Sequence, residues 1–502
     1  MLRYTGLVLA AAAYPSKSEA VPAVDRAAGP QTAAVDTAHQ VSDVMDRLST
    51  YMSQARDNAL PDHVLEQAKW HVLDTFAAMV SGSELAPGMA ATAFAIAYGG
   101  KAVATVVGTT TACGPIEAAL ANGVMAHADE TDDSWPGGWH PGCNVVSAAL
   151  ATGEQFGISG AHFLRAAALG YDIGARMLVT IRPGLQSSHK ATHAVGGIFG
   201  AASAASCAAS LTPQQIRWMF DYTAQQCSGI ASWYRDRDHI EKGFVFGGMP
   251  ARSGVTSALL AHSGWTGVDD IFAGRDNFLL ANSPQAKPDL LVDKLGERFE
   301  IAGTNIKRWT VGSPVQAPLD AMEALLKRHP IDPDQVQQIL LRSEPGSVVD
   351  NSDPPDINIQ YVMALMIIDK NATFRSIHDR PRMQDPAILR LREKVRLEAP
   401  ASGGGNGAAR LPLLEITLTD GTRITQDTGP VLGTVENPMT REQFVAKCRD
   451  LMEPVIGAAS STRLIDRTME LEKTKDIREL RPLLQWTRAS GPPRLADYPT
   501  AK

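Results

Sequence analysis

Cysteine is scarce in this chain, and so are aromatic residues. The 502 residues include five cysteines and 6% aromatics. No two cysteines stand in the Cys-x-x-Cys spacing of common zinc and redox motifs, so the sequence predicts neither a disulfide framework nor a zinc site. We interpret all five as structural, reduced thiols, and Cys143 alone stands near other candidate reactive residues.

Long apolar runs and an excess of positive charge are also missing. No run approaches the roughly 20 apolar residues that span a bilayer, so we expect no membrane-integral segment. The formal net charge is −7 and no long basic run occurs, which argues against nucleic acid as a partner. What remains is an ordinary globular composition, 44% hydrophobic, with length for about two to four domains.

The first 40 residues differ from the rest of the chain. Residues 14–38 are rich in small and polar groups and are too poor in large apolar ones to order themselves. Before them, the short apolar run 6–13 is followed by Ser18-Glu-Ala20, which resembles a signal-peptide cleavage site. We expect a disordered leader and a cytoplasmic protein, with export through this segment as the alternative.

Helical periodicity then dominates up to about residue 302. Segment 60–82 predicts a helix with proline and aspartate in its first turn, and the alanine-rich segments 90–98 and 116–125 predict helices that approach one another closely. Beyond residue 302, alternating segments at 337–344 and 413–420 predict strands, the second closing with an Asp-Gly hairpin turn.

The expected fold class is mainly α with an α+β second domain. Because helical periodicity returns after Thr440, we expect one large all-helical domain that is interrupted by a smaller α+β lid domain. The expected parts are a leader at 1–40, the helical domain at 41–302, the α+β lid at 303–438, the rest of the helical domain at 439–490 and a tail at 491–502.

One polar segment, His127 to Cys143, lies between two alanine-rich helical runs. It contains four carboxylates, two histidines and two tryptophans. Because the flanking runs would bury most of their faces, we expect the segment to enter the interior. There, carboxylates beside imidazoles acquire the shifted pKa values that general acid–base chemistry requires. The alternative is a helix cap and turn with its charges facing water.

Two further segments carry candidate binding groups. His189 and His193 precede a glycine- and alanine-rich helix, whose N-terminus suits an anion. Lys242 and Arg252 flank a glycine-rich stretch that we expect to form a flexible hairpin or loop, with a solvated turn as the alternative.

Short motifs over residues 41–480 resemble one family when they are taken together. They are Lys69-Trp-His-Val-Leu-Asp-Thr75 with Ser81-Gly82, Ala121 to His127, Glu130 to Ser134 with His140-Pro141, Gly170-Tyr171, Gly197 to Gly200, Lys307-Arg-Trp and Asn437 to Thr440. On these residues the chain resembles the MmgE/PrpD family of 2-methylcitrate dehydratases, cis-aconitate decarboxylases and an iminodisuccinate epimerase. The resemblance implies a homodimer with its active site between a helical domain and an α+β lid, and neither a metal nor an organic cofactor.

Carried over position by position, the resemblance implies catalytic residues. They are Glu130, the loop hydroxyl of Ser134, the loop histidine His140, a histidine at His189 or His193, Lys242, Lys307 and the lid tyrosine Tyr361. We add Arg252 and Asp133 to the two lysines as candidate substrate-binding residues. A base removes a proton next to a carboxylate, and nearby cations stabilise the enediolate that results.

We expect the protein to be a cofactor-independent lyase that acts on a small carboxylate. The main hypothesis is a hydro-lyase that resembles 2-methylcitrate dehydratase. The alternatives are a decarboxylase or an epimerase of the same family, or a ligand-binding homologue without catalysis. A metal-assisted lyase or hydrolase, with Glu130, Asp132, Asp133 and His140 as ligands, is a further alternative.

The chain departs from the family pattern at three positions. Gly312 stands where cis-aconitate decarboxylases have a lid histidine, and Gln316 replaces a second histidine four residues later. Val245 replaces the histidine of the family's Lys-x-x-His segment. These departures argue against simple transfer of a named activity.

Overall fold

The computed structural model describes residues 40–185, 188–399, 413–427 and 429–488. The expected leader, apart from residue 40, and the expected tail at 491–502 fall outside these ranges, and so does the glycine-rich segment 403–407, for which the sequence predicts a flexible connection inside the lid. In the described part of the chain, no helix combines the length and apolar character needed to cross a membrane.

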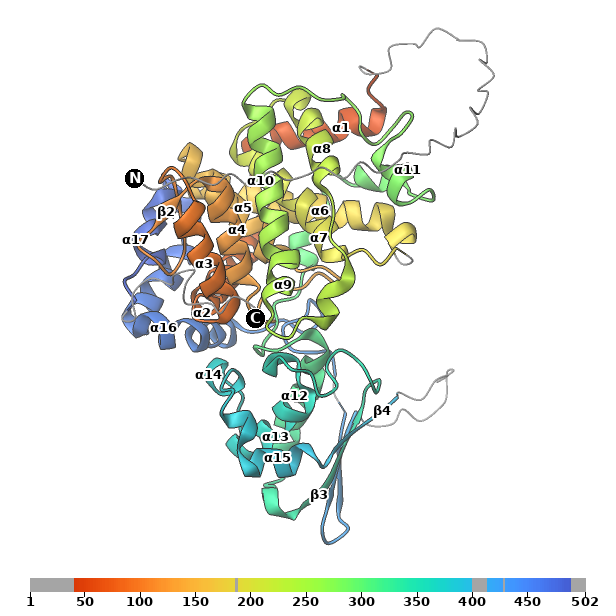
Figure 1. Cartoon of the computed structure of the whole chain (residues 1–502), viewed down its shortest axis with the longest axis vertical. Coiled ribbons are helices and arrows are strands. Elements are labelled where there is room, and N and C mark those ends of the chain that lie inside the picture. The colour runs from red at the N-terminus through yellow and green to blue at the C-terminus, as the bar shows by residue number, and fades with distance from the viewer. Residues whose placement is uncertain (1–39, 186–187, 400–412, 428, 489–502) are drawn as a thin grey trace, which may run out of the picture. The chain divides into compact units, whose positions relative to one another are not determined.

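Most of the chain folds as helices around one large apolar core (Figure 1). Those before residue 283 are α1 (Asp43–Gln54), α2 (Asp62–Gly82), α3 (Ala86–Tyr98), α4 (Pro115–Ala126), α5 (Pro141–Phe156), α6 (Gly160–Leu185), α7 (Thr192–Ala208), α8 (Pro213–Gln226), α9 (Ile240–Gly243), α10 (Met249–His262) and α11 (Phe278–Asn282). Two short antiparallel strands, β1 (Ala104–Thr105) and β2 (Ala112–Cys113), pair in a hairpin. Helix α2 confirms the helix that the sequence predicts over 60–82.

Small residues set the spacing between the central helices α6, α7 and α10. A Cβ atom added to Gly170 would lie 2.8 Å from the carbonyl oxygen of Gly200, and one added to Gly200 would lie 2.9 Å from that of Gly170. On the other side of α7, a Cβ at Gly254 of α10 would lie 2.5 Å from the amide nitrogen of Ala202. The backbones therefore touch, as the alanine-rich sequence predicts.

The glycine-rich stretch between Lys242 and Arg252 is helical, so the predicted flexible hairpin or loop is wrong. Helix α9 continues through a π-helical turn, η4 (Phe244–Gly248), into α10. A Cβ at Gly247 would lie 2.0 Å from the carbonyl oxygen of Gly123 on α4. The glycines therefore serve close helix packing.

A second, smaller apolar core gathers residues 309–424. Its elements are α12 (Ser313–Arg328), β3 (Val336–Arg342), α13 (Ile359–Asp369), α14 (Phe374–Ile377), α15 (Pro386–Arg392), β4 (Val395–Glu398), β5 (Leu414–Leu418) and β6 (Arg423–Gln426). The strands form one sheet in the order β4-β3-β5-β6, with β3 parallel to β4 and antiparallel to β5. The predicted Asp-Gly turn joins β5 to β6, and Gly421 adopts φ +88° there. A mainly helical domain with a smaller α+β domain is confirmed.

The chain then returns to the helical core through α16 (Arg441–Met469) and α17 (Arg481–Leu484). Helix α16 begins with a capping box of Thr440 and Gln443 and is interrupted at Gly457, where φ is +75°. Figure 1 shows α16, in blue, beside α2, in orange, although they come from opposite ends of the chain. Trp70 and Phe444 stack at 4.6 Å across this contact.

A buried ion pair reinforces the same contact. The ammonium of Lys447 on α16 donates hydrogen bonds to Asp74 on α2 at 2.5 Å and to the carbonyl oxygen of Thr131 at 3.0 Å. All three residues are buried. Helix α16 therefore holds the polar loop that follows α4.

Asp172 on α6 gives a pH-dependent test of the fold. One of its carboxylate oxygens accepts the backbone N–H of Glu300 at 2.6 Å, and burial raises the pKa of Asp172 to about 7. Folding therefore favours the protonated form of Asp172. The stability that this residue contributes is fully present below the unfolded pKa near 4 and is lost as pH rises through about 7.

We therefore expect Asp172→Asn, which keeps the acceptor oxygen, to become more stabilising relative to the wild type as pH rises from 5 to 8. The difference should grow by roughly 1.4 kcal/mol per pH unit from pH 5 to about pH 7, where Asp172 of the folded protein ionises. Urea unfolding at both pH values measures it. An equal difference between the two proteins at pH 5 and pH 8 would contradict the assignment.

Candidate active site

The polar loop between α4 and α5 lies in the interior, as predicted. Its four carboxylates, at Asp129, Glu130, Asp132 and Asp133, are each no more than 5% exposed. The alternative of a solvated cap and turn is therefore wrong. Such a concentration of buried charge is costly unless every charge meets a partner.

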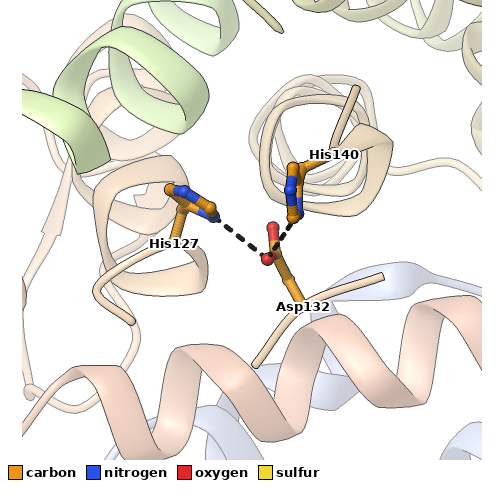
Figure 2. A group of neighbouring side chains, drawn as sticks. All are labelled: His127, Asp132 and His140. Atoms are coloured by element: carbon orange, nitrogen blue, oxygen red, sulfur yellow. Dashed lines mark hydrogen bonds and ion pairs between the residues drawn. The ribbon is translucent and has the colours of Figure 1, made fainter. Parts of the chain in front are cut away.

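Asp132 joins the two histidines that begin and end the loop. One of its carboxylate oxygens lies 3.0 Å from Nδ1 of His127, at the end of α4, and 3.0 Å from Nδ1 of His140, just before α5. Figure 2 shows both rings turned toward this oxygen. Burial raises the pKa of Asp132, but the two imidazoles outweigh burial and hold it well below its usual value. Asp132 therefore stays ionised and fixes the orientation of His140.

Two lysines reach Glu130 from different parts of the chain. Lys242 on α9 forms an ion pair with one of its carboxylate oxygens. Lys307, from the segment before α12, donates a hydrogen bond to its backbone carbonyl at 2.6 Å and lies 3.8 Å from its other carboxylate oxygen. Burial opposes ionisation of Glu130, yet the two ammonium groups hold its pKa well below the usual range.

His140 lies next to Lys307. Its Nδ1 atom is 3.4 Å from the ammonium nitrogen of Lys307, which is also 3.7 Å from Asp132. Burial and Lys307 lower the pKa of His140, against the opposing effect of Asp132. An imidazole beside a fixed cation can transfer a proton to or from a substrate on which negative charge develops, while the cation stabilises that charge.

An aromatic wall closes one side of this cluster. Phe246, from the π-turn η4, stacks on His193 with ring centroids 3.7 Å apart and on His127 at 4.7 Å. The ammonium of Lys242 lies 5.1 Å from the centre of the Trp233 ring and 5.4 Å from that of Phe246. His193 lies at 5.3 Å from the His140 ring, and burial lowers its pKa well below 6.5.

The structure thus brings together Glu130, His140, His193, Lys242 and Lys307. Ser134 is half-buried beside them, and its backbone pairs with Asn305, two residues before Lys307. This pairing anchors the Lys307 segment to the loop.

Asp133 also lies in the loop, but its oxygens are occupied. It contacts Nδ1 of His71 at 2.6 Å and accepts hydrogen bonds from the hydroxyl of Tyr171 at 2.6 Å and the backbone N–H of Gly142 at 2.9 Å. These partners fix the start of α5 and leave Asp133 a structural anchor rather than a free group for substrate.

Three other predicted residues are not brought to the cluster. Tyr361 on α13 is buried in the smaller core, where its hydroxyl donates to the carbonyl of Ser376 at 2.7 Å. His189 and Arg252 are exposed side chains, and Arg252 lies on the outer face of α10. Of the two alternatives for the second histidine, the structure places His193 and not His189 beside His140.

The loop has a second contact with the α+β domain, which sequence reasoning missed. The backbone N–H of Glu130 donates to Asp356 at 2.9 Å, and Nε2 of His378 lies 3.3 Å from Asp129. Burial raises the pKa of Asp356 to about 6, against the lowering effect of His378. More than 200 positions separate Glu130 from Asp356 in the sequence, so no local pattern signals the contact.

The cluster contains two groups with the composition of a metal site. They are His127 with Asp132 and His140, and His127 with Glu130 and His239, each with ligand atoms within 4.8 Å of one another. However, Lys307 lies 3.7 Å from Asp132, and Lys242 is paired with Glu130. A divalent cation would have to displace these ammonium groups from the carboxylates, whereas a carboxylate ligand can accept hydrogen bonds from them. The two lysines therefore favour a carboxylate ligand.

Binding of such a ligand should be linked to protonation. Burial and Lys307 keep His140 neutral in the free protein, and a bound dianion would oppose both effects and raise its pKa. Succinate binding should therefore take up protons in the window that opens below pH 6.5, and affinity should fall as pH rises through it. Calorimetry in buffers of different ionisation enthalpy measures the uptake, and a binding enthalpy independent of the buffer would contradict it.

Comparisons with known proteins agree with this organisation. The model of the MmgE/PrpD N-terminal domain matches residues 46–291, and that of the MmgE/PrpD C-terminal domain matches residues 309–471. The cis-aconitate decarboxylase of Homo sapiens is 25% identical over 480 residues, which cover 90% of this chain and 96% of that protein. The cis-aconitate decarboxylase of Aspergillus terreus is 23% identical over 483 residues, which cover 88% and 96%.

Proposed function

This chain belongs to the MmgE/PrpD family, and we propose that it is a lyase that acts on a small polycarboxylate through a carbanion formed next to a carboxylate. The observation that carries the proposal is the meeting of Lys307 and His140, 3.4 Å apart and both buried, beside Glu130 and Lys242. A preorganised cation in a water-poor site stabilises negative charge on an enediolate far better than it would in water.

Decarboxylation is the reaction that we propose first. The relatives compared are cis-aconitate decarboxylases that align over nearly their whole length, which supports this alternative over 2-methylcitrate dehydration. In the proposed step, the bond between a carbon and its carboxylate breaks and carbon dioxide leaves. The electron pair is delocalised through the neighbouring carbon–carbon double bond toward a second carboxylate that the lysines hold, and a proton is then added to the carbon next to that carboxylate.

The identity of the proton donor follows from what stands near Glu130. A Cβ at Gly312 would lie 3.7 Å from Cγ of Glu130, so a histidine there would face the cluster, and this chain has none. Gln316 cannot take its place, because its side-chain amide donates to the carbonyls of Trp309 and Val311 at 2.8 Å. We therefore assign proton transfer to His140, with Asp132 fixing its orientation.

Proton NMR in deuterated water tests the proposal. We expect the protein to convert cis-aconitate or a related unsaturated tricarboxylate with loss of carbon dioxide and incorporation of one deuterium at the product carbon that takes up the proton. A panel that includes citrate and 2-methylcitrate distinguishes dehydration, which releases water, from epimerisation, which exchanges deuterium without net loss.

Two outcomes would overturn the proposal. The first is no conversion of any member of the panel by protein that is folded and binds the carboxylates. The second is activity that disappears on chelation and returns with a divalent metal, which would favour the metal-assisted alternative. A homodimer stays a prediction from the resemblance.

A further inference from the structure

His239 is a buried imidazole that the proposed reaction does not use. It precedes α9 and is 5% exposed, and neither ring nitrogen has a hydrogen-bond partner within the described residues. Buried polar atoms in folded proteins nearly always have partners, so a ring with two unpaired nitrogens calls for a ligand. Its backbone is also left-handed, with φ +61°, a conformation uncommon outside glycine.

His239 faces the same cluster as the catalytic groups. Its ring centroid lies 5.2 Å from that of His127, and a ring nitrogen of His239 lies within 4.8 Å of a carboxylate oxygen of Glu130. Lys242 follows three residues later, so one short stretch of chain delivers both an imidazole and an ammonium to Glu130.

The charges of the cluster show why a neutral donor is needed. Lys242 and Lys307 are balanced by Glu130 and Asp132, which remain ionised despite burial. A ligand with two carboxylates therefore adds negative charge that the lysines alone do not neutralise. Burial and Lys242 lower the pKa of His239 well below 6.5, and a neutral imidazole still carries one N–H to donate.

We propose that His239 is a specificity-determining residue that donates a hydrogen bond to a second carboxylate of the substrate, one that does not react. This inference rests on the proposed function and restricts its substrates to dicarboxylates and larger. The lysines then hold the carboxylate next to the reacting carbon, and His239 fixes the far end of the molecule.

The test compares succinate with butyrate, which have the same number of carbons and differ by one carboxylate. Dissociation constants from calorimetry or NMR titration need no turnover. The wild type should bind succinate at least about tenfold more tightly, since a hydrogen bond to a charged group is worth a factor of this size or more. His239→Phe, which fills the space without a donor, should reduce this preference to near unity and leave butyrate binding unchanged.

Two further variants make the result specific. His239→Gln keeps an N–H and should restore much of the preference, and His329→Gln, at an exposed position after α12, should match the wild type. Thermal unfolding checks that each variant is folded. A His239→Phe protein that keeps the succinate preference, or that loses affinity for both ligands equally, overturns the inference. A wild type that prefers succinate without any turnover contradicts the proposed function and leaves the inference standing.

Discussion

Replacing Lys307 with methionine is expected to lower kcat/KM by about 10²–10³-fold, the typical loss when one preorganised charge-stabilising group is removed. Its ammonium lies within 4 Å of His140, Asp132 and the Glu130 carboxylate, so the variant would leave two buried anions with fewer countercharges. Steady-state kinetics on the substrate found in the NMR panel measures the loss.

The pH profile of the same variant separates a catalytic effect from a structural one. Lys307 lowers the pKa of His140, so its removal should raise that pKa and move the basic form of His140 to higher pH. The limb of the kcat/KM profile that reports the protonation of His140, the proposed proton donor, should shift to higher pH. Lys327→Met, at an exposed position of α12, is the matched control and should behave as the wild type. Wild-type kinetics in Lys307→Met would end the proposal.

The second large effect is expected from His140→Gln. Glutamine keeps a polar side chain but cannot carry a proton, so kcat should fall by about 10²–10⁴-fold, the contribution of a positioned acid or base. The change should weaken succinate binding far less, because the two lysines remain. Deuterium incorporation from solvent into product should slow in proportion to turnover.

Asp132→Asn gives the matching test of orientation. Its acceptor oxygen contacts both His127 and His140, and an amide there no longer favours the same tautomer or stabilises the imidazolium. We expect a loss in kcat with little change in KM. If His140→Gln retains full activity while Asp132→Asn loses it, the proton donor is another group that Asp132 positions, and His127 is the next candidate.

Local patterns predicted the elements of the fold that depend on neighbouring residues. The helix over 60–82 and the Asp-Gly turn between β5 and β6 each depend on neighbouring residues, and both are present. The prediction for the stretch around Gly247 was wrong because glycine occurs both in flexible loops and in closely packed helices. The same glycine-rich sequence is compatible with a flexible loop and with a helix whose backbone touches a second helix. Only the contact with Gly123 on α4 decides between the two structures.

Some residues of the candidate site could likewise be predicted from local patterns, and others could not. The loop from His127 to His140 was recognisable because apolar runs on both sides demand that it be buried. His189 and Arg252 were chosen because their types suit anions, but the direction of a side chain depends on the rotation of its helix against its neighbours. His239 was missed because one histidine in a polar stretch carries no signal until Glu130, far away in sequence, comes within reach.

The hydrogen bonds that Lys447 donates to Asp74 and Thr131 can form only late in the synthesis of the chain. The loop that contains Thr131 leaves the ribosome more than 300 residues before the lysine that supports it. Until then Asp74 lacks its countercharge, and the loop lacks the donor that holds one of its carbonyls. A nascent chain can therefore form this support only after α16 has emerged, and we expect a chain that ends before α16 to lack the ordered loop.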